Sequence, residues 1–165
     1  MSTQRASSPR KPRGALRLAF KAPRVLYRLR LGWLLGHRFL LLTHRGRTSG
    51  RIYQTMLEVV RYDRATRESV VVSGFGARAD WYRNVRAHPA LEVRTGGQRY
   101  QPEQRLVPVE EREAILATYR ARSPRLLKWL MGVLGYAYDG SAAGLHTLAE
   151  AMPMVGFRPR AAARP

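Results

Sequence analysis

The chain has 165 residues, of which 45% are apolar, and it contains no cysteine. This length predicts one domain with a packed core, and the lack of thiols excludes disulfides and thiolate metal sites. The longest apolar stretch, residues 129–138, is about half of what a bilayer span needs, so we expect no transmembrane helix. Lys and Arg number 30 against 11 Asp and Glu, a formal net charge of +19, which favours polyanionic partners such as nucleic acid, anionic lipid or a small ligand with several phosphates and carboxylates.

The N-terminal part divides into two predicted segments. Residues 1–14 are rich in Ser, Pro and basic side chains and form a disordered basic tail, although such an acid-free start is also typical of organellar transit peptides. Residues 15–37 mix apolar side chains, among them Phe20, Leu26 and Trp33, with arginines, which predicts a basic amphipathic helical segment. This segment has two candidate docking partners, the rest of the domain and an anionic membrane surface.

The middle of the chain is dominated by strand signals. β-Branched, aromatic and leucine residues are frequent in residues 39–43, 53–62 and 69–73, and the short turn at 63–66 makes the last two antiparallel neighbours. Residues 91–95 and 99–107 flank Gly96 and Gly97, a two-residue hairpin connection that favours positive φ. Residues 152–157 return as a predicted edge strand.

Helix signals occupy the intervals between these strands. A short helix is predicted over residues 79–87, where Pro89 ends it. A second helix runs from Pro108 to about residue 121, and its acidic first turn complements the helix dipole. A third begins at Pro124, and its predicted apolar face consists of Leu126, Leu127, Leu130 and Val133. Hairpins around a small core with helices at one end predict an α+β fold with an antiparallel barrel or a strongly curved sheet.

Two glycine-rich loops follow predicted buried strands. The first loop, residues 45–51, reads Arg-Gly-Arg-Thr-Ser-Gly-Arg and supplies cations and hydroxyls without an acidic competitor. The second loop, residues 73–78, begins with Ser-Gly-Phe-Gly and is followed by Trp81 and Asn84. Such donors suit a phosphate or carboxylate group. Two loops of this kind in one small chain predict a single anionic ligand held from two sides.

In this order and at this spacing the motifs resemble a known family. Thr-x-x-Gly-Arg-x-Ser-Gly at 43–50, Ser-Gly-x-Gly at 73–76 and Trp-Tyr-x-Asn at 81–84 are similar to the deazaflavin-dependent nitroreductase and quinone reductase family. The resemblance covers roughly residues 25–120. It implies a split β-barrel of about six antiparallel strands with flanking helices over residues 38–159, followed by a short tail at 160–165.

The resemblance also implies a coenzyme and its contacts. Members of this family use coenzyme F420, an 8-hydroxy-5-deazaflavin with a phosphodiester and a polyanionic oligoglutamate tail. The first loop would hold the phosphate or glutamate end, the following strand would pack on the ring, and Asn84 would orient the second loop, which it closely follows. The implied coenzyme-binding residues are Arg45, Gly46, Arg47, Thr48, Ser49, Gly50, Arg51, Thr55, Met56, Leu57, Ser73, Gly74, Phe75, Gly76, Arg78 and Asn84.

The implied activity is that of an oxidoreductase, in which reduced F420 gives a hydride to a small hydrophobic acceptor that is quinone-like, nitroaromatic or otherwise conjugated. Tyr136 and Tyr138 are the candidate catalytic residues, because tyrosines line the substrate site in some relatives, and either these or solvent supplies the proton. The chain departs from the family pattern at Thr48, where relatives often carry Lys, and in the second loop, where Arg78 is a candidate substitute for a missing basic residue. A cytoplasmic enzyme is implied, peripheral on the inner face of the plasma membrane if the N-terminal segment binds lipid.

Other functions are open or disfavoured on the sequence. A non-enzymatic basic module that binds nucleic acid or an anionic membrane has the net charge in its favour, but no nucleic-acid motif supports it. The same barrel could bind flavin mononucleotide (FMN), because a fold does not determine its cofactor. A dinucleotide fingerprint at Gly74-x-Gly76-x-x-Ala79 is disfavoured, since a hairpin follows it. The four histidines are scattered and predict no metal site.

Overall fold

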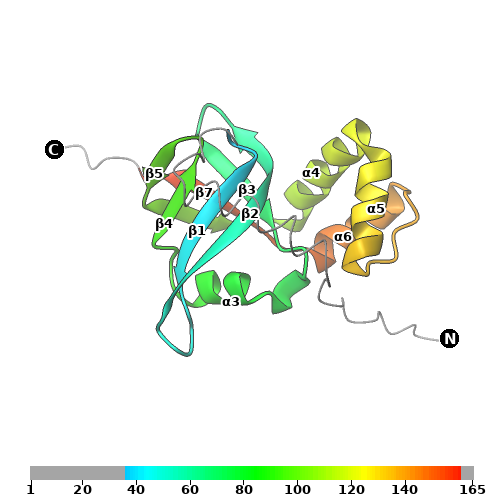
Figure 1. Ribbon diagram of the computed structural model, residues 1–165. Helices are drawn as coiled ribbons and strands as arrows, with labels where there is room; N and C mark the ends of the chain where they lie inside the picture. Colours follow the sequence, from blue (N-terminus) through cyan, green and yellow to red (C-terminus); the bar gives the residue numbers. More distant parts are fainter. Residues whose placement is uncertain (1–35, 161–165) are drawn as a thin grey trace.

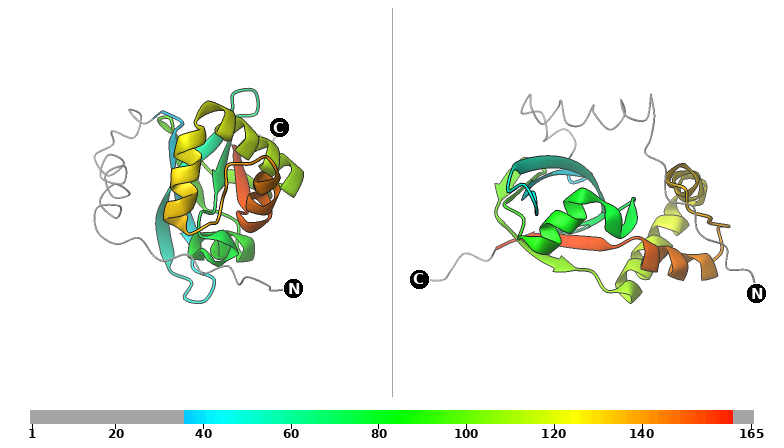
Figure 2. Two further views of the ribbon diagram at one scale, coloured as in Figure 1. Left: turned by 90° about the vertical axis from the view of Figure 1, so that its right-hand side faces the viewer. Right: turned by 90° about the horizontal axis from the view of Figure 1, so that it is seen from below.

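The computed structural model describes residues 36–160, which form an antiparallel barrel with helices packed around it (Figure 1). The predicted basic tail, the predicted helical segment up to residue 35 and residues 161–165 lie outside this part of the chain. Figure 2 shows from two further sides that α4 (Val109–Arg122), α5 (Pro124–Leu134) and α6 (Ala143–Ala151) gather beside the barrel, whereas α3 (Asp80–Ala87) lies across one of its open ends.

The seven strands follow one another in the sheet in the order β5-β4-β1-β2-β3-β7-β6, and all neighbours are antiparallel. Their bounds are Phe39–Arg45 (β1), Ile52–Asp63 (β2), Glu68–Val72 (β3), Glu92–Thr95 (β4), Gln98–Tyr100 (β5), Pro102–Leu106 (β6) and Met154–Pro159 (β7). The two end strands, β5 and β6, are separated along the chain by Gln101 alone, so the sheet must curl until its ends meet. The predicted α+β split barrel is confirmed.

The two predicted hairpin turns are also confirmed. Gly96 and Gly97 connect β4 to β5 with φ of +54° and +77°, a conformation that other residues rarely adopt. Between β2 and β3, Asp63 Oδ1 accepts hydrogen bonds from the backbone N–H groups of Ala65 and Thr66 at 2.8 and 3.3 Å. The register of β2 then shifts between Val59 and Arg61. Such an irregularity bends a strand, which allows β2 to pair with β1 along its first part and with β3 along its second.

Two strand predictions are wrong in part. Residues 99–107 form two strands, because β5 pairs with β4 whereas β6 turns away to pair with β7, and Pro102 at the start of β6 lacks a backbone N–H. This division raises the strand number from about six to seven. β7 is not an edge strand, since it lies between β3 and β6. A dinucleotide-binding unit at Gly74-x-Gly76-x-x-Ala79 would require β3 and β4 to be parallel strands of one βαβ unit. They are not neighbours in the sheet, so this alternative is excluded.

The helices span Asp80–Ala87 (α3), Val109–Arg122 (α4), Pro124–Leu134 (α5) and Ala143–Ala151 (α6), and a 3-10 turn at Gly76–Arg78 precedes α3. The sequence analysis missed α6. It also misassigned part of the apolar face of α5, where Leu127 and Met131 are buried but Leu126 and Val133 are 41% and 37% exposed. Within residues 36–160, no helix combines the length and the apolar character that a bilayer crossing requires.

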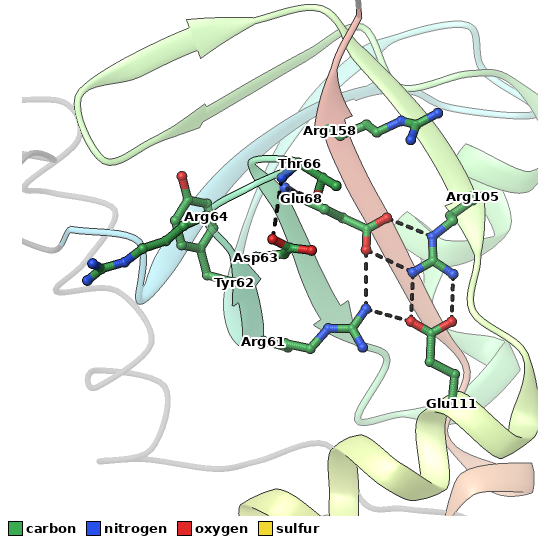
Figure 3. A pocket seen from close by; sticks show the side chains of 9 residues that line it. All are labelled: Arg61, Tyr62, Asp63, Arg64, Thr66, Glu68, Arg105, Glu111 and Arg158. Atoms are coloured by element: carbon green, nitrogen blue, oxygen red, sulfur yellow. Dashed lines mark hydrogen bonds and ion pairs between the residues drawn. The ribbon is translucent and has the colours of Figure 1, made fainter.

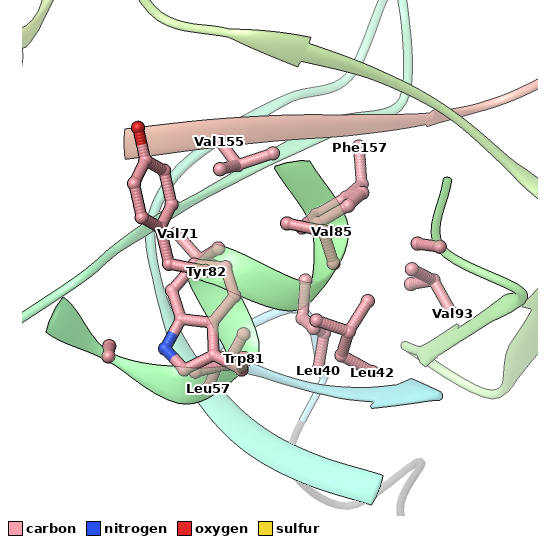
Figure 4. Packing of buried hydrophobic residues seen from close by; sticks show 12 residues of the cluster. Leu40, Leu42, Leu57, Val71, Trp81, Tyr82, Val85, Val93, Val155 and Phe157 are labelled. Atoms are coloured by element: carbon pink, nitrogen blue, oxygen red, sulfur yellow. The ribbon is translucent and has the colours of Figure 1, made fainter. Parts of the chain in front are cut away.

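Apolar side chains pack on both faces of the sheet. The barrel interior holds Leu40, Leu42 and Phe157 together with Trp81 and Val85 of α3 (Figure 4). The outer face of β3 and β7 packs against α4, α5 and α6, with Val70 and Met154 facing Leu127 and Leu148. Trp81 is 8% exposed and packs in the barrel interior. Because α3 fills one end of the barrel, its first turn is held close to the hairpin between β1 and β2.

Candidate functional site

The first loop connects β1 to β2 as a tight turn. Gly46 N–H donates to Arg51 O at 2.8 Å, and Gly50 N–H donates to Gly46 O at 2.9 Å. A Cβ on Gly46 would stand 2.7 Å from both Ser49 Oγ and the ring of Tyr53, so only glycine fits this position without a rearrangement. Arg51 N–H also donates to Ser49 Oγ at 3.3 Å. The loop is therefore held in a defined shape by its own contacts.

Arg47 ties the first loop to α3. Its backbone N–H and its guanidinium Nη1 both donate to Asn84 Oδ1 at 3.1 Å, and Nη1 also lies 3.2 Å from Asp80 Oδ1. Asn84 is buried, whereas the side chain of Asp80 is 84% exposed. These contacts position the loop over the first turns of α3, and we call them the Arg47 clamp. Asn84 thus contacts the first loop, whereas the resemblance implied that it orients the second.

The sequence analysis did not find two members of this arrangement. His44, at 2% exposure, lies beneath the first loop, with Nδ1 3.2 Å from Asn84 Nδ2 and Nε2 3.0 Å from Thr55 Oγ1. Asp80 is the acid that pairs with Arg47. One signal for His44 was its position on the inward-facing side of β1, two residues beyond Leu42. The partners come from residues far apart in the sequence, so spacing alone could not reveal them.

The second loop is closed by a buried serine. Ser73 Oγ donates to Gly76 O at 2.7 Å, and Gly76 N–H donates back to Ser73 O at 2.9 Å. Ser73 N–H donates to Pro153 O at 2.8 Å, which fixes the loop to the start of β7. Phe75 is 38% exposed, and Arg78 is exposed as well. The hydroxyl of Ser73 is thus used in shaping the loop.

Both loops present backbone donors. Among the hydrogen bonds within residues 36–160, none uses the N–H groups of Thr48 and Ser49 in the first loop or of Gly74 and Phe75 in the second. Thr48 and Ser49 are exposed, and the exposed cations Arg45 and Arg51 flank them. Consecutive N–H groups beside cations form a concavity that favours an anion. Because α3 begins just after the second loop and contacts the first, the two sets of donors lie at the same end of the molecule.

The three residues of β2 that the resemblance implies as contacts of the deazaflavin ring, Thr55, Met56 and Leu57, do not lie on one face of the strand. Side chains alternate along a strand, so Thr55 and Leu57 share the inward face and Met56 lies on the opposite one. Leu57 belongs to the barrel core, and Thr55 contacts His44. A ring that packs against Met56 would therefore lie on the outer side of β2.

The two candidate tyrosines have different surroundings. The Tyr136 hydroxyl lies 3.5 Å from the point where a Cβ on Gly76 would stand, so it is beside the second loop. Burial raises the pKa of Tyr136, which keeps its hydroxyl protonated at neutral pH. Tyr138 is 8% exposed among the helices, and its hydroxyl donates to Ser141 O at 3.2 Å. The structure brings Tyr136, and not Tyr138, to the loops.

A second group of charged residues surrounds an open basin of about 640 Å³ (Figure 3). Arg105 makes paired hydrogen bonds of 2.7–2.8 Å to both Glu68 and Glu111, and Arg61 contacts both carboxylates. Hydrogen bonding from Arg105 lowers the pKa of Glu111 to about 2. These charges neutralise one another, and they lie at the far end of β2 and β3 from the two loops. The cluster joins β2, β3, β6 and α4 and is not a candidate coenzyme site.

The fold and the two donor-rich loops together define an antiparallel split barrel that carries exposed donors at one end. The family model of the F420H(2)-dependent quinone reductases matches residues 26–133, more than half of the chain. The chain therefore belongs to this family. It is an F420-dependent reductase, and its coenzyme is F420.

The chain is similar to several solved structures at low identity. The F420-H2 dependent reductase FDR-A is 20% identical, with 75% of this chain and 96% of that chain covered and a TM-score of 0.49. A domain-swapped dimer is 18% identical, with 86% and 99% covered and a TM-score of 0.51. An FMN-binding protein related to pyridoxamine 5'-phosphate oxidase from Nostoc punctiforme PCC 73102 is 17% identical, with 89% and 81% covered and a TM-score of 0.47. These likenesses concern the fold and carry no statement about activity. No curated protein matches the chain.

The donor set fits F420. A phosphodiester and a run of glutamates need N–H groups, hydroxyls and cations, and the first loop offers all three at exposed positions. Within residues 36–160, only Nη1 of the Arg47 guanidinium contacts Asp80 and Asn84, so Nε and Nη2 can still donate to an anion beside the exposed cations Arg45 and Arg51. The deazaflavin requires an apolar surface, for which the half-buried Met56 on β2 and the exposed Phe75 in the second loop are candidates.

Proposed function

We propose that the protein transfers a hydride from reduced F420 to a quinone-like, nitroaromatic or other conjugated acceptor. The observation that carries the proposal is the pair of donor-rich loops, held at one end of the barrel by the Arg47 clamp. The first loop would bind the phosphate and glutamate groups, and the second would bind the opposite side of the coenzyme. When bound, F420 supplies the hydride chemistry, and the chain contributes binding and orientation.

Tyr136 is the proposed proton donor. A conjugated acceptor that receives a hydride takes up a proton as well, and a group that remains protonated at neutral pH can provide it. The place of Tyr136 beside the second loop supports this role. Tyr138, with its hydroxyl bonded to Ser141, serves as the matched control.

The test is a steady-state assay with purified protein, reduced F420 and either a quinone such as menadione or a nitroaromatic compound. Oxidation of the coenzyme is followed optically, with reduced FMN as the alternative donor. We expect turnover with reduced F420, and a loss of about 10²-fold or more in kcat for Tyr136→Phe but not for Tyr138→Phe. Turnover by Tyr136→Phe at the wild-type rate would assign the proton to solvent.

We also propose that the enzyme works at an anionic membrane surface on the cytoplasmic side, where a lipid-soluble acceptor resides. Leu126, Trp129 and Val133 lie on one face of α5 and are 41%, 55% and 37% exposed. Arg125 and Lys128 lie next to them in the same helix. Exposed apolar side chains with neighbouring cations suit the headgroup region of an anionic bilayer.

Co-sedimentation with anionic and neutral vesicles tests this surface. The full chain should bind anionic vesicles, and Trp129→Ala should weaken the binding. Leu106→Ala is the matched control, because Leu106 is 49% exposed but belongs to β6 and not to α5. Equal vesicle binding by the two variants would show that α5 is not the membrane-binding surface. Absence of vesicle binding by the full chain would refute the proposed membrane association.

A further inference from the structure

His44 is the one buried histidine among residues 36–160 whose two ring nitrogens both have partners on other elements. Nε2 faces Thr55 of β2, and Nδ1 faces Asn84 of α3. The ring of Tyr53 stacks on it, with centroids 6.0 Å apart. His44 therefore connects β2 to α3 directly beneath the first loop.

The contacts determine where the imidazole proton lies. Asn84 Oδ1 receives two hydrogen bonds from Arg47, from groups that can only donate, so the orientation of the amide is fixed. Asn84 Nδ2 is then a donor that points at His44 Nδ1, and Nδ1 must accept. The neutral ring carries its proton on Nε2 and donates it to Thr55 Oγ1. The result is a directed chain of hydrogen bonds from Arg47 through Asn84 and His44 to Thr55, which we call the His44 relay.

Protonation of His44 is incompatible with this chain. An imidazolium has N–H groups at both positions, so Nδ1–H would face the amide N–H of Asn84. Rotation of the Asn84 amide would relieve that conflict only by turning its NH₂ group toward Arg47, which would break both hydrogen bonds of the Arg47 clamp. The clamp therefore requires a neutral His44.

We propose that His44 is a positioning residue, which must be neutral to hold the first loop in the form that binds the anionic end of F420. The inference rests on the proposed role of the first loop in coenzyme binding. Burial lowers the pKa of His44, and the nearby Asp80 carboxylate opposes this shift in part. The other groups that face the imidazole or its partners are Arg47 from the first loop and the Tyr53 ring from β2. Affinity for F420 should thus be constant above about pH 6.5 and fall by about tenfold per pH unit below the pKa of His44.

Two measurements test the proposal on the full chain. Long-range ¹H–¹⁵N NMR of histidine-labelled protein at pH 7.5 should show His44 with its proton on Nε2, and the signal is assigned by its loss in His44→Gln. Fluorescence titration with oxidised F420 between pH 5 and 8 should show a fall in affinity on acidification. His44→Gln should abolish the fall, whereas His88→Gln, at an exposed position after α3, should retain it.

The outcomes are distinct. A proton on Nδ1, or the same pH profile in the wild type and in His44→Gln, would overturn the proposal. If His44→Gln does not fold, Asn84→Asp replaces it: a carboxylate at position 84 accepts from Arg47 with one oxygen and from a protonated Nδ1 of His44 with the other, so the fall in affinity on acidification should disappear, and an unchanged profile would count against the relay. If F420 does not bind at any pH, the proposed function fails, but the backbone amide signal of Arg47 should still move as His44 titrates. An unmoved Arg47 signal would overturn the relay itself.

Discussion

Arg47→Ala separates the binding role of the first loop from its structural role. The substitution removes the guanidinium contacts with Asp80 and Asn84 but keeps the backbone N–H of residue 47 and its hydrogen bond to Asn84 Oδ1. The Asp80 carboxylate is 84% exposed, and exposed ion pairs contribute about 0–1 kcal/mol. We therefore expect the free energy of unfolding to fall by only about 1 kcal/mol.

The expected effect on coenzyme binding is larger. A hydrogen bond to a charged partner contributes about 1.5–3 kcal/mol, which corresponds to a loss of about 10- to 150-fold in affinity. The Kd for oxidised F420 is measured by fluorescence titration, and the free energy of unfolding by urea denaturation. Arg64→Ala is the matched control, because Arg64 is exposed in the turn at the other end of β2 and its loss changes the net charge equally. Equal affinities of the two variants in folded protein would refute a specific role for Arg47.

Three further changes test other parts of the structure. F420 affinity should fall as the salt concentration rises, more steeply for a coenzyme with a longer glutamate tail, and independence of tail length at low salt would argue against the loops as its binding site. Gly46→Ala should lower the free energy of unfolding by roughly 1–3 kcal/mol, since its Cβ would stand 2.7 Å from Ser49 Oγ, whereas Gly132→Ala on α5, with nothing within 4 Å, should not destabilise the protein. Because the pKa of Glu111 is lowered to about 2, its ion pairs stabilise the fold above about pH 4.5 and lose this effect as the pH falls toward 2. Glu111→Gln should therefore make stability less dependent on pH in that range, and an unchanged acid-unfolding curve would contradict this.

Much of the barrel could be predicted from local signals. Gly96-Gly97 and the Asp63 turn specify hairpins through backbone geometry, so β4–β5 and β2–β3 were predictable. β7 was assigned to an edge because sequence patterns do not reveal pairing partners. Its apolar residues, buried on both faces from Met154 to Phe157, are typical of a central strand. The missed helix α6 does carry a signal, since Leu145, Leu148 and Ala149 have helical spacing.

The site was predictable to a lesser degree. The positions of the two loops follow from motif order, because glycines and donors are local features. The Arg47 clamp and the His44 relay join residues up to 40 positions apart, so they depend on how α3 packs against β1. Thr55, Met56 and Leu57 could not all contact one ring, because consecutive side chains of a strand point to opposite faces. The sequence analysis did not take this alternation along β2 into account.

The central claim is that this barrel end binds F420 through its two loops. The most direct measurement is a parallel fluorescence titration of the purified full chain with oxidised F420 and with FMN, repeated with the Arg47→Ala variant. The account predicts saturable binding of F420, no comparable binding of FMN, and an affinity for F420 that is about 10- to 150-fold weaker in the variant. Absence of F420 binding, or tighter binding of FMN, would contradict it.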